Sequence, residues 1–305
     1  MQNLDIVWAD PYFIIAMKND IWYDGTGLEC RGKSIYDLAR YERKSRGEIY
    51  SAEPLSVAAV REDPYRAVVA HYAASYGAFT ICDVGAHLGI TAMDTVGQAT
   101  ALGADVRAFA FDAGVAAELT WRNFENNGFA SEITFERAAV GDLDGHGIMY
   151  TEEGESVGNR VILGGSSSYP VRFVKLDTYL KVNNAAGPAT VKIDVQGAEP
   201  FVLNGMRELI EDHPVSIMME FTPWALRQSG VDPVQLLSDF VATHHIFDIG
   251  FHRERMIEVV DIPALLHRVD SAQPWWTDLL LVPFSVRDED TLLACLREAG
   301  ENAVV

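Results

Sequence analysis

Cysteine is scarce in this chain, and its spacing excludes two kinds of site. Cys30, Cys82 and Cys295 stand far apart, and no two of them have the short spacing of a zinc-binding motif. Three isolated cysteines also do not make the disulfide framework of a small secreted protein. We therefore expect a protein that works in a reducing compartment.

Long apolar segments are also missing. No apolar stretch approaches the roughly 20 residues that a membrane-spanning helix needs. The first residues, MQNLDIVWADPYFIIAMKND, lack the basic head and apolar run of a secretion signal. We expect a soluble, cytoplasmic protein.

Basic residues are few relative to acids. The chain has 24 Lys and Arg against 44 Asp and Glu, which gives a net charge of -20. A field of this sign repels nucleic acid and anionic membranes. We expect small or neutral partners, and neither nucleic acid nor a membrane.

The pattern from residue 79 onward predicts an α/β fold. The 305 residues, 49% hydrophobic, suffice for one large α/β domain with additions or for two domains. Apolar runs of strand length alternate with segments long enough for helices, which indicates a parallel sheet covered on both faces. The predicted strands are FTICDVG, VRAFAFD, ITFERAAV, TVKIDV, VSIMMEF and HIFDIG, with a late strand at 278–282.

Two other regions have a different composition. Residues 1–78 are predicted to form an appendage, with a hairpin that turns at Asn19 and Asp20 and a helix from about Ile35. We expect this appendage to cover a ligand crevice or to form a homodimer contact, and residues 79–305 to form the main domain. Residues 151–169 are rich in Gly, Ser and Glu and are predicted to be a mobile surface loop.

A glycine loop follows the first of these strands, in TICDVGAHLGITAM. Glycine is needed where the backbone takes a positive φ or where a ligand approaches closely, and Gly85 and Gly89 fit these needs. The dinucleotide motif G-x-G-x-x-G is not met, because His87 and Ile90 stand at its second and third glycine positions. The pattern suits a ligand with an ammonium and a carboxylate but no phosphate, such as S-adenosylmethionine, with Asp83 on the ammonium side. An ordinary glycine turn is the alternative.

A second acid ends the next predicted strand. Asp112 lies 29 residues after Asp83, at a place where a carboxylate can accept both ribose hydroxyls of a nucleoside. An acid on a solvated loop is the alternative for Asp112 taken alone. Two such acids at neighbouring strand ends together favour a nucleoside-containing cofactor.

Over residues 79–284 the chain resembles the FkbM-type methyltransferases. The resemblance rests on motifs in the family's order: ICDVGAHLG, AFAFDAGVAAELTWRNFENNG, AAVGDLDG, VKLDTYL, VKIDVQGAEPFVLNGM and IMMEF. It implies a class I, S-adenosylmethionine-dependent methyltransferase with a Rossmann-like, mostly parallel seven-stranded sheet and helices on both faces. It also implies methylation of oxygen on natural products or sugars.

The resemblance also assigns residues. Asp83, Gly85, Ala86 and Gly89 fall on the methionine-binding loop, Asp112 on the ribose acid, and Asp142 where adenine is contacted, although a plain acidic turn is the alternative there. Asn123 and Asn127 match family asparagines, which we interpret as helix-capping or turn residues. His87 and Gln196 depart from the family, which usually has Asn and Glu at these positions.

The fourth predicted strand carries the candidate chemistry. VKIDV puts Lys192 and Asp194 on one face, either as an ion pair or as catalytic residues. A hydroxyl acceptor must lose its proton to a base, and Asp194 and His87 are the candidates.

Asp194 and two further acids are candidates for a metal site. Asp194, Glu199 and Glu220 form a possible divalent-cation set, which the loss of an acid at Gln196 weakens, and we predict no metal site. The alternatives to an O-methyltransferase are a non-catalytic cofactor-binding module and an enzyme that methylates nitrogen on a peptide or amide.

Overall fold

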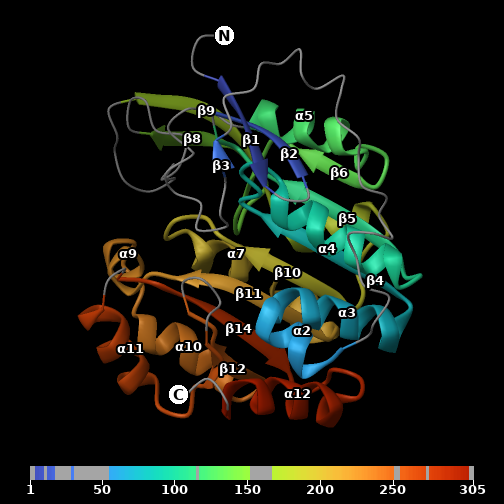
Figure 1. The fold of residues 1–305 in the computed structure, drawn as a ribbon. Coiled ribbons are helices and arrows are strands. Elements are labelled where there is room, and N and C mark those ends of the chain that lie inside the picture. The colour runs from blue at the N-terminus through green and yellow to red at the C-terminus, as the bar shows by residue number, and fades with distance from the viewer. Residues whose placement is uncertain are drawn as a thin grey trace.

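The computed structural model describes most of the chain (Figure 1). Its described residues are 4–9, 12–17, 29–30, 55–114, 117–151, 167–250, 255–272 and 275–301. Within these ranges no helix is long and apolar enough to cross a membrane.

A central sheet organises the molecule. Within the described residues it has eight strands in the order β13-β12-β14-β11-β10-β4-β5-β6. Adjacent strands are parallel from β11 to β6, whereas β14 runs antiparallel to both of its neighbours. The strands are β4 (Ala78–Val84), β5 (Asp105–Phe111), β6 (Ile133–Glu136), β10 (Ala189–Ile193), β11 (Val215–Phe221), β12 (His244–Asp248), β13 (Ile257–Glu258) and β14 (Thr277–Pro283).

The predicted α/β fold is confirmed, with two corrections to the strands. The sheet has eight strands instead of seven, because the two-residue β13 pairs with β12 at the edge. The predicted strand ITFERAAV is divided, since its first half is β6 and its second half, β7 (Ala139–Val140), pairs in another sheet. A two-residue strand has no periodicity to detect, and a division inside one apolar run leaves no turn signal.

Two hydrophobic cores lie on opposite faces of the sheet, and neighbouring strand residues alternate between them. Ile81 packs into one core and Cys82 into the other, as do Leu280 and Leu281. This explains why the central strands are apolar almost throughout. Helices α2 (Val57–Glu62), α3 (Pro64–Tyr76), α4 (Ile90–Ala101), α5 (Ala117–Asn127) and α12 (Glu289–Glu301) contribute to the first core. The second is covered by α6 (Leu176–Val182), α7 (Glu199–Gly205), α8 (Arg207–Asp212), α9 (Pro223–Gln228), α10 (Pro233–Val241) and α11 (Ile262–Ser271) (Figure 1).

Helix α3 belongs to the first core, although it precedes the predicted boundary at residue 78. Tyr72 is fully buried, and its hydroxyl lies 3.1 Å from the Ser216 Oγ on β11. His71 Nε2 lies 2.7 Å from the backbone oxygen of Arg287. Residues 64–76 therefore pack as part of the main domain.

The described residues also form two small sheets. The first joins β1 (Leu4–Ala9), β2 (Tyr12–Met17) and β3 (Glu29–Cys30) in the order β2-β1-β3, with β2 packed against α5 (Figure 1). Its hairpin joins β1 and β2, whereas the predicted turn at Asn19 and Asp20 and the predicted helix from Ile35 lie outside the described residues.

The second small sheet has the order β7-β9-β8. Strands β8 (Gly145–Thr151) and β9 (Ser167–Val174) pair antiparallel. They shorten the predicted 151–169 loop at both ends, and its remaining residues, 152–166, lie outside the described ones.

Gly205 allows α7 to approach the turn after β7. A Cβ at this position would lie 1.9 Å from the backbone oxygen of Gly141. We predict that Gly205→Ala lowers the free energy of unfolding by about 1 to 3 kcal/mol, because backbone must move to accept the methyl group. Urea denaturation measures this. Gly187→Ala is the matched control, since a Cβ there meets nothing within 4 Å; equal losses in both variants would contradict the prediction.

Candidate active site

The glycine loop leaves the sheet where the strand order reverses, between β4 and β10. In such open sheets, ligands bind at the carboxyl ends of the strands beside the reversal. Gly85 and Gly89 have φ values of +79° and +82°. A Cβ on Gly85 would lie 1.8 Å from the backbone oxygen of Asp194, and one on Gly89 would lie 2.4 Å from Cε1 of Phe124. Both glycines are therefore required by positive φ and by close packing within the protein itself.

Asp112, directly after β5, holds the loop from one side. Its Oδ2 accepts a hydrogen bond from the backbone N–H of His87 at 2.7 Å, and its Oδ1 accepts one from Gly114 at 2.6 Å. Burial raises the pKa of the Asp112 carboxyl, and the two N–H groups oppose this shift. Each oxygen keeps a lone pair, so the predicted contact with ribose stays compatible with this geometry.

Helix α5 fastens the same loop through Thr120 and through Asn123, for which the sequence favours a capping or turn role. The Asn123 amide is fully buried and donates to the backbone oxygen of Leu88 at 3.1 Å, and Thr120 donates to the backbone oxygen of His87. Asn123 therefore anchors the loop and is not a cap. Asn127 donates to the Asn123 backbone oxygen at 2.8 Å.

Lys192 joins the loop to the two strand ends. Its Nζ donates to the Gly85 backbone oxygen at 2.7 Å and lies 3.4 Å from Asp83 Oδ1 and 3.3 Å from Asp194 Oδ2. The side chains of Lys192 and Asp83 are 10% and 3% exposed, whereas that of Asp194 is 39% exposed. The predicted ion pair between Lys192 and Asp194 is present, and it includes Asp83 as well.

Burial and charge act in opposite directions on this cluster. Burial alone lowers the pKa of Lys192, but the carboxylates of Asp194 and Asp83 raise it above its ordinary value. Burial raises the pKa of Asp83, and the Lys192 ammonium opposes this effect. Lys192 therefore stays protonated and cannot act as a base.

Gln196 lies between two acids beside this cluster. Its Nε2 is 3.1 Å from Asp194 Oδ1 and 3.4 Å from each carboxylate oxygen of Glu220. Burial and the charges of Asp194 and Glu199 raise the pKa of Glu220 well above its ordinary value. Among the described residues, no group of three His, Cys, Asp or Glu side chains is arranged to hold a metal ion.

Asp142 and Ala86 are the remaining residues that the sequence assigns to cofactor binding. Asp142 is exposed in the turn between β7 and β8, and its contact with adenine stays a prediction. Ala86 is buried, and its backbone N–H donates to the Phe111 oxygen at 3.0 Å.

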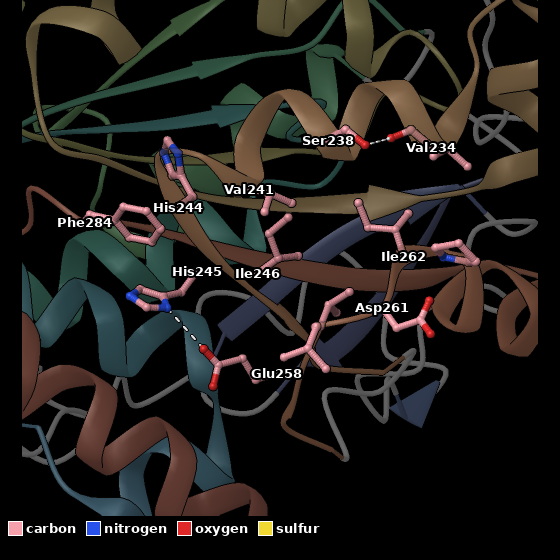
Figure 2. A pocket seen from close by; sticks show the side chains of 13 residues that line it. Val234, Ser238, Val241, His244, His245, Ile246, Glu258, Asp261, Ile262 and Phe284 are labelled. Carbon is pink, nitrogen blue, oxygen red and sulfur yellow. Dashed lines mark hydrogen bonds and ion pairs between the residues drawn. The ribbon is translucent and has the colours of Figure 1, made fainter.

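A cavity of about 720 Å³ lies elsewhere, among α10, β12 and the chain after β13 (Figure 2). His244 and His245 line this cavity and begin β12, which runs parallel to β11. The cavity therefore lies at the amino ends of the parallel strands, whereas the glycine loop lies at their carboxyl ends. Figure 2 shows His245 turned toward Glu258, 3.1 Å away, and its other ring nitrogen is 2.9 Å from Glu289. His245, Glu258 and Glu289 are thus paired with one another, at the end of the sheet away from the glycine loop.

Glu199 provides a test of the buried charges. Its Oε1 accepts hydrogen bonds from Val195 at 3.2 Å and Gly197 at 3.1 Å, and burial raises its pKa from 4.5 to about 7. A raised pKa stabilises the fold at low pH, and this contribution is lost as the pH rises from 4.5 through 7. We predict that, as the pH rises over this range, the free energy of unfolding of Glu199→Gln increases by about 1 to 3 kcal/mol relative to that of the unaltered protein.

Denaturant unfolding at several pH values measures this difference. Glu211→Gln, at an exposed acid of α8, is the control and should show a difference that does not vary with pH. A constant difference for Glu199→Gln as well would refute the raised pKa.

The comparisons with known proteins identify the family of the chain. The model of the methyltransferase FkbM domain matches residues 29–256. No curated protein sequence matches the chain. Among solved structures, methyltransferase FkbM from Methylobacillus flagellatus has 14% identity and a TM-score of 0.40 over 74% of this chain, which spans only 56% of that longer protein.

Two O-methyltransferases are also distantly similar. The Bacillus cereus enzyme, solved with SAH, has 11% identity and a TM-score of 0.39 over 81% of this chain and 94% of its own. The Thermotoga maritima enzyme has 11% identity and a TM-score of 0.36 over 93% and 86%. The sequence match, and not these distant likenesses, assigns the chain. Since that match covers well over half of its length, the chain belongs to the family of the methyltransferase FkbM domain.

Proposed function

We propose that the protein transfers a methyl group from S-adenosylmethionine to a hydroxyl group of a small molecule. The observation that carries this proposal is the Lys192 cluster. One buried ammonium holds the glycine loop, the buried Asp83 and the half-exposed Asp194 within 3.4 Å of itself. It thereby places a cofactor-binding loop and a candidate base side by side.

The residues present fit the cofactor. Asp83 is buried at the end of β4 beside the Lys192 ammonium, 3.4 Å from its Oδ1, and would lie on the ammonium side of the cofactor. Gly85, Ala86 and Gly89 lead to the start of α4, where free N–H groups attract a carboxylate. Asp112 would accept from the ribose hydroxyls, and Asp142 would contact adenine. S-adenosylmethionine supplies a methyl group on a positively charged sulfur, whose leaving group is a neutral thioether.

Asp194 is the group that we assign to the acceptor proton. A hydroxyl becomes a good nucleophile only as its proton leaves, so a base must lie within hydrogen-bond reach. The side chain of Asp194 is 39% exposed, whereas Lys192 is buried, stays protonated and orients it. Most of the remaining catalysis comes from holding the acceptor in line with the methyl group.

The net charge of the chain and the resemblance to its family both support a small-molecule acceptor. A net charge of -20 disfavours nucleic acid, which supports a small acceptor. Incubation with methyl-labelled S-adenosylmethionine and panels of hydroxyl, amine and amide compounds tests the proposal. Label recovered on hydroxyl oxygen supports it, whereas label on nitrogen or no transfer in any panel contradicts it.

Asp112→Ala should weaken the affinity for S-adenosylhomocysteine by about 2 to 4 kcal/mol, because two hydrogen bonds to a charged group are lost. Calorimetry measures this. Since Asp112 also holds His87, the control is Thr120→Val, which removes another loop bond without touching ribose. We expect a loss below about tenfold for the control, about 1.4 kcal/mol. An equal loss in both variants would mean that Asp112 acts only on the loop.

Asp194→Asn should lower single-turnover methyl transfer roughly 10²- to 10⁴-fold with little change in cofactor affinity, the usual effect of removing a general base. His87→Asn is the comparison, since Asn tolerates the left-handed φ of +49° at that position. If His87→Asn abolishes transfer and Asp194→Asn does not, the base is His87.

A further inference from the structure

The backbone around Gln196 aims its side chain. Gln196 has a φ of +56°, a backbone conformation that residues other than glycine rarely adopt. The carboxylate of Glu199 binds the N–H groups of Val195 and Gly197 on either side of it. Ser229 donates to the Gly197 oxygen at 3.1 Å. The backbone on both sides of Gln196 is held by hydrogen bonds, and the residue itself has a strained conformation. Strain that is maintained in this way suggests that the position of the Gln196 side chain has a role.

The amide of Gln196 must present its nitrogen to its neighbours. The groups within reach of Nε2 are carboxylate oxygens, one on Asp194 and two on Glu220. Carboxylates accept hydrogen bonds, so the donor end of the amide faces them. With Lys192 at Oδ2 and Gln196 at Oδ1, both oxygens of Asp194 are fixed in direction.

Acids from several elements surround this point. Asp83 is on β4, Glu199 on α7 and Asp278 on β14, beside Glu220 in the register of β11 and β14. Lys192 is already shared between Asp83 and Asp194. The Gln196 amide is therefore the donor that lies between Asp194 and Glu220, and Thr222 Oγ1 donates separately to Glu220 Oε1 at 3.0 Å.

We propose that Gln196 is a positioning residue for methyl transfer, whose amide joins Asp194 to Glu220 and so directs the Asp194 carboxylate without a bound cation. The role in transfer rests on the proposed function, because that function assigns the acceptor proton to Asp194. An acid at position 196 would instead bring three carboxylates to one point. Such a group needs a proton or a divalent cation to be stable.

Thermal unfolding of Gln196→Glu tests the contact without any methyl transfer. At about pH 8 we expect its Tm to fall roughly 2 to 8 °C below that of the unaltered protein, and the gap to narrow at about pH 5.5 as protons relieve the repulsion. Millimolar MgCl2 should raise the Tm of Gln196→Glu at the higher pH and leave the unaltered protein unchanged.

Gln235→Glu is the matched control. Gln235 Nε2 also donates to an aspartate, Asp239 Oδ1 at 2.7 Å, but on the exposed face of α10. Its Tm should stay within about 1 °C at both pH values. The proposal is overturned if Gln196→Glu behaves like this control, or if MgCl2 raises the Tm of the unaltered protein as much as that of Gln196→Glu.

Measurements of methyl transfer test the positioning role of Gln196 separately from the thermal unfolding experiments. In Gln196→Glu the acid limb of the single-turnover pH profile should move to higher pH, because an added negative charge makes Asp194 hold its proton more tightly. Gln196→Met removes the amide without adding charge and should lower turnover more than cofactor affinity. If both variants keep the normal turnover and profile while the Tm results hold, the contact stands and the positioning role is overturned. If Asp194→Asn keeps full turnover, Asp194 is not the base and the positioning role is overturned with it, whereas the proposed function fails only if the unaltered protein transfers no label to a hydroxyl compound.

Discussion

The buried ammonium of Lys192 is the interaction on which the rest of the site depends. It neutralises Asp83, contacts Asp194 and binds the backbone oxygen of Gly85, three groups that come from two strands and a loop. A buried cation is costly without partners, so each contact requires the others. Such a cluster adds little net stability, but it permits one arrangement of the strand ends and disfavours alternatives in which a charge is left alone.

Around this cluster, the loop is fixed by backbone contacts more than by side-chain chemistry. Asp112 and Asn123 bind N–H and C=O groups of residues 87 and 88, while Gly85 and Gly89 have no room for a side chain. The loop is therefore shaped before any ligand binds. Preorganisation of this kind reduces the entropy that binding must overcome.

The sequence predicted the parts of the fold that have a local cause. The runs ending at Val84 and Phe221 are apolar because both faces of their strands are covered, and they were placed to within one residue. Lys192 and Asp194 were predicted to share a face because side chains alternate along a strand. The antiparallel direction of β14 was not predicted, because an apolar run carries no sign of its direction.

The contacts of the site were harder to predict for a similar reason. Asn123 was interpreted as a cap, since an asparagine in a helix says nothing about a loop 35 residues earlier in the chain. Gln196 was recognised as a departure from its family, but its neighbour Glu220 comes from the next strand, 24 residues away. Such pairs are set by the register of β10 against β11, in which Ile193 lies opposite Met219.

The contact between Gly85 and the end of β10 also links two equilibria. Because Lys192 holds the Gly85 oxygen and the Asp194 carboxylate at once, a ligand that shifts the loop also changes the electrostatic environment of that acid. Linkage is reciprocal, so the free energy by which a bound cofactor alters proton affinity at Asp194 equals that by which protonation of Asp194 alters cofactor affinity. Under the proposed function, the release of the demethylated cofactor is therefore linked through Lys192 to the protonation of Asp194.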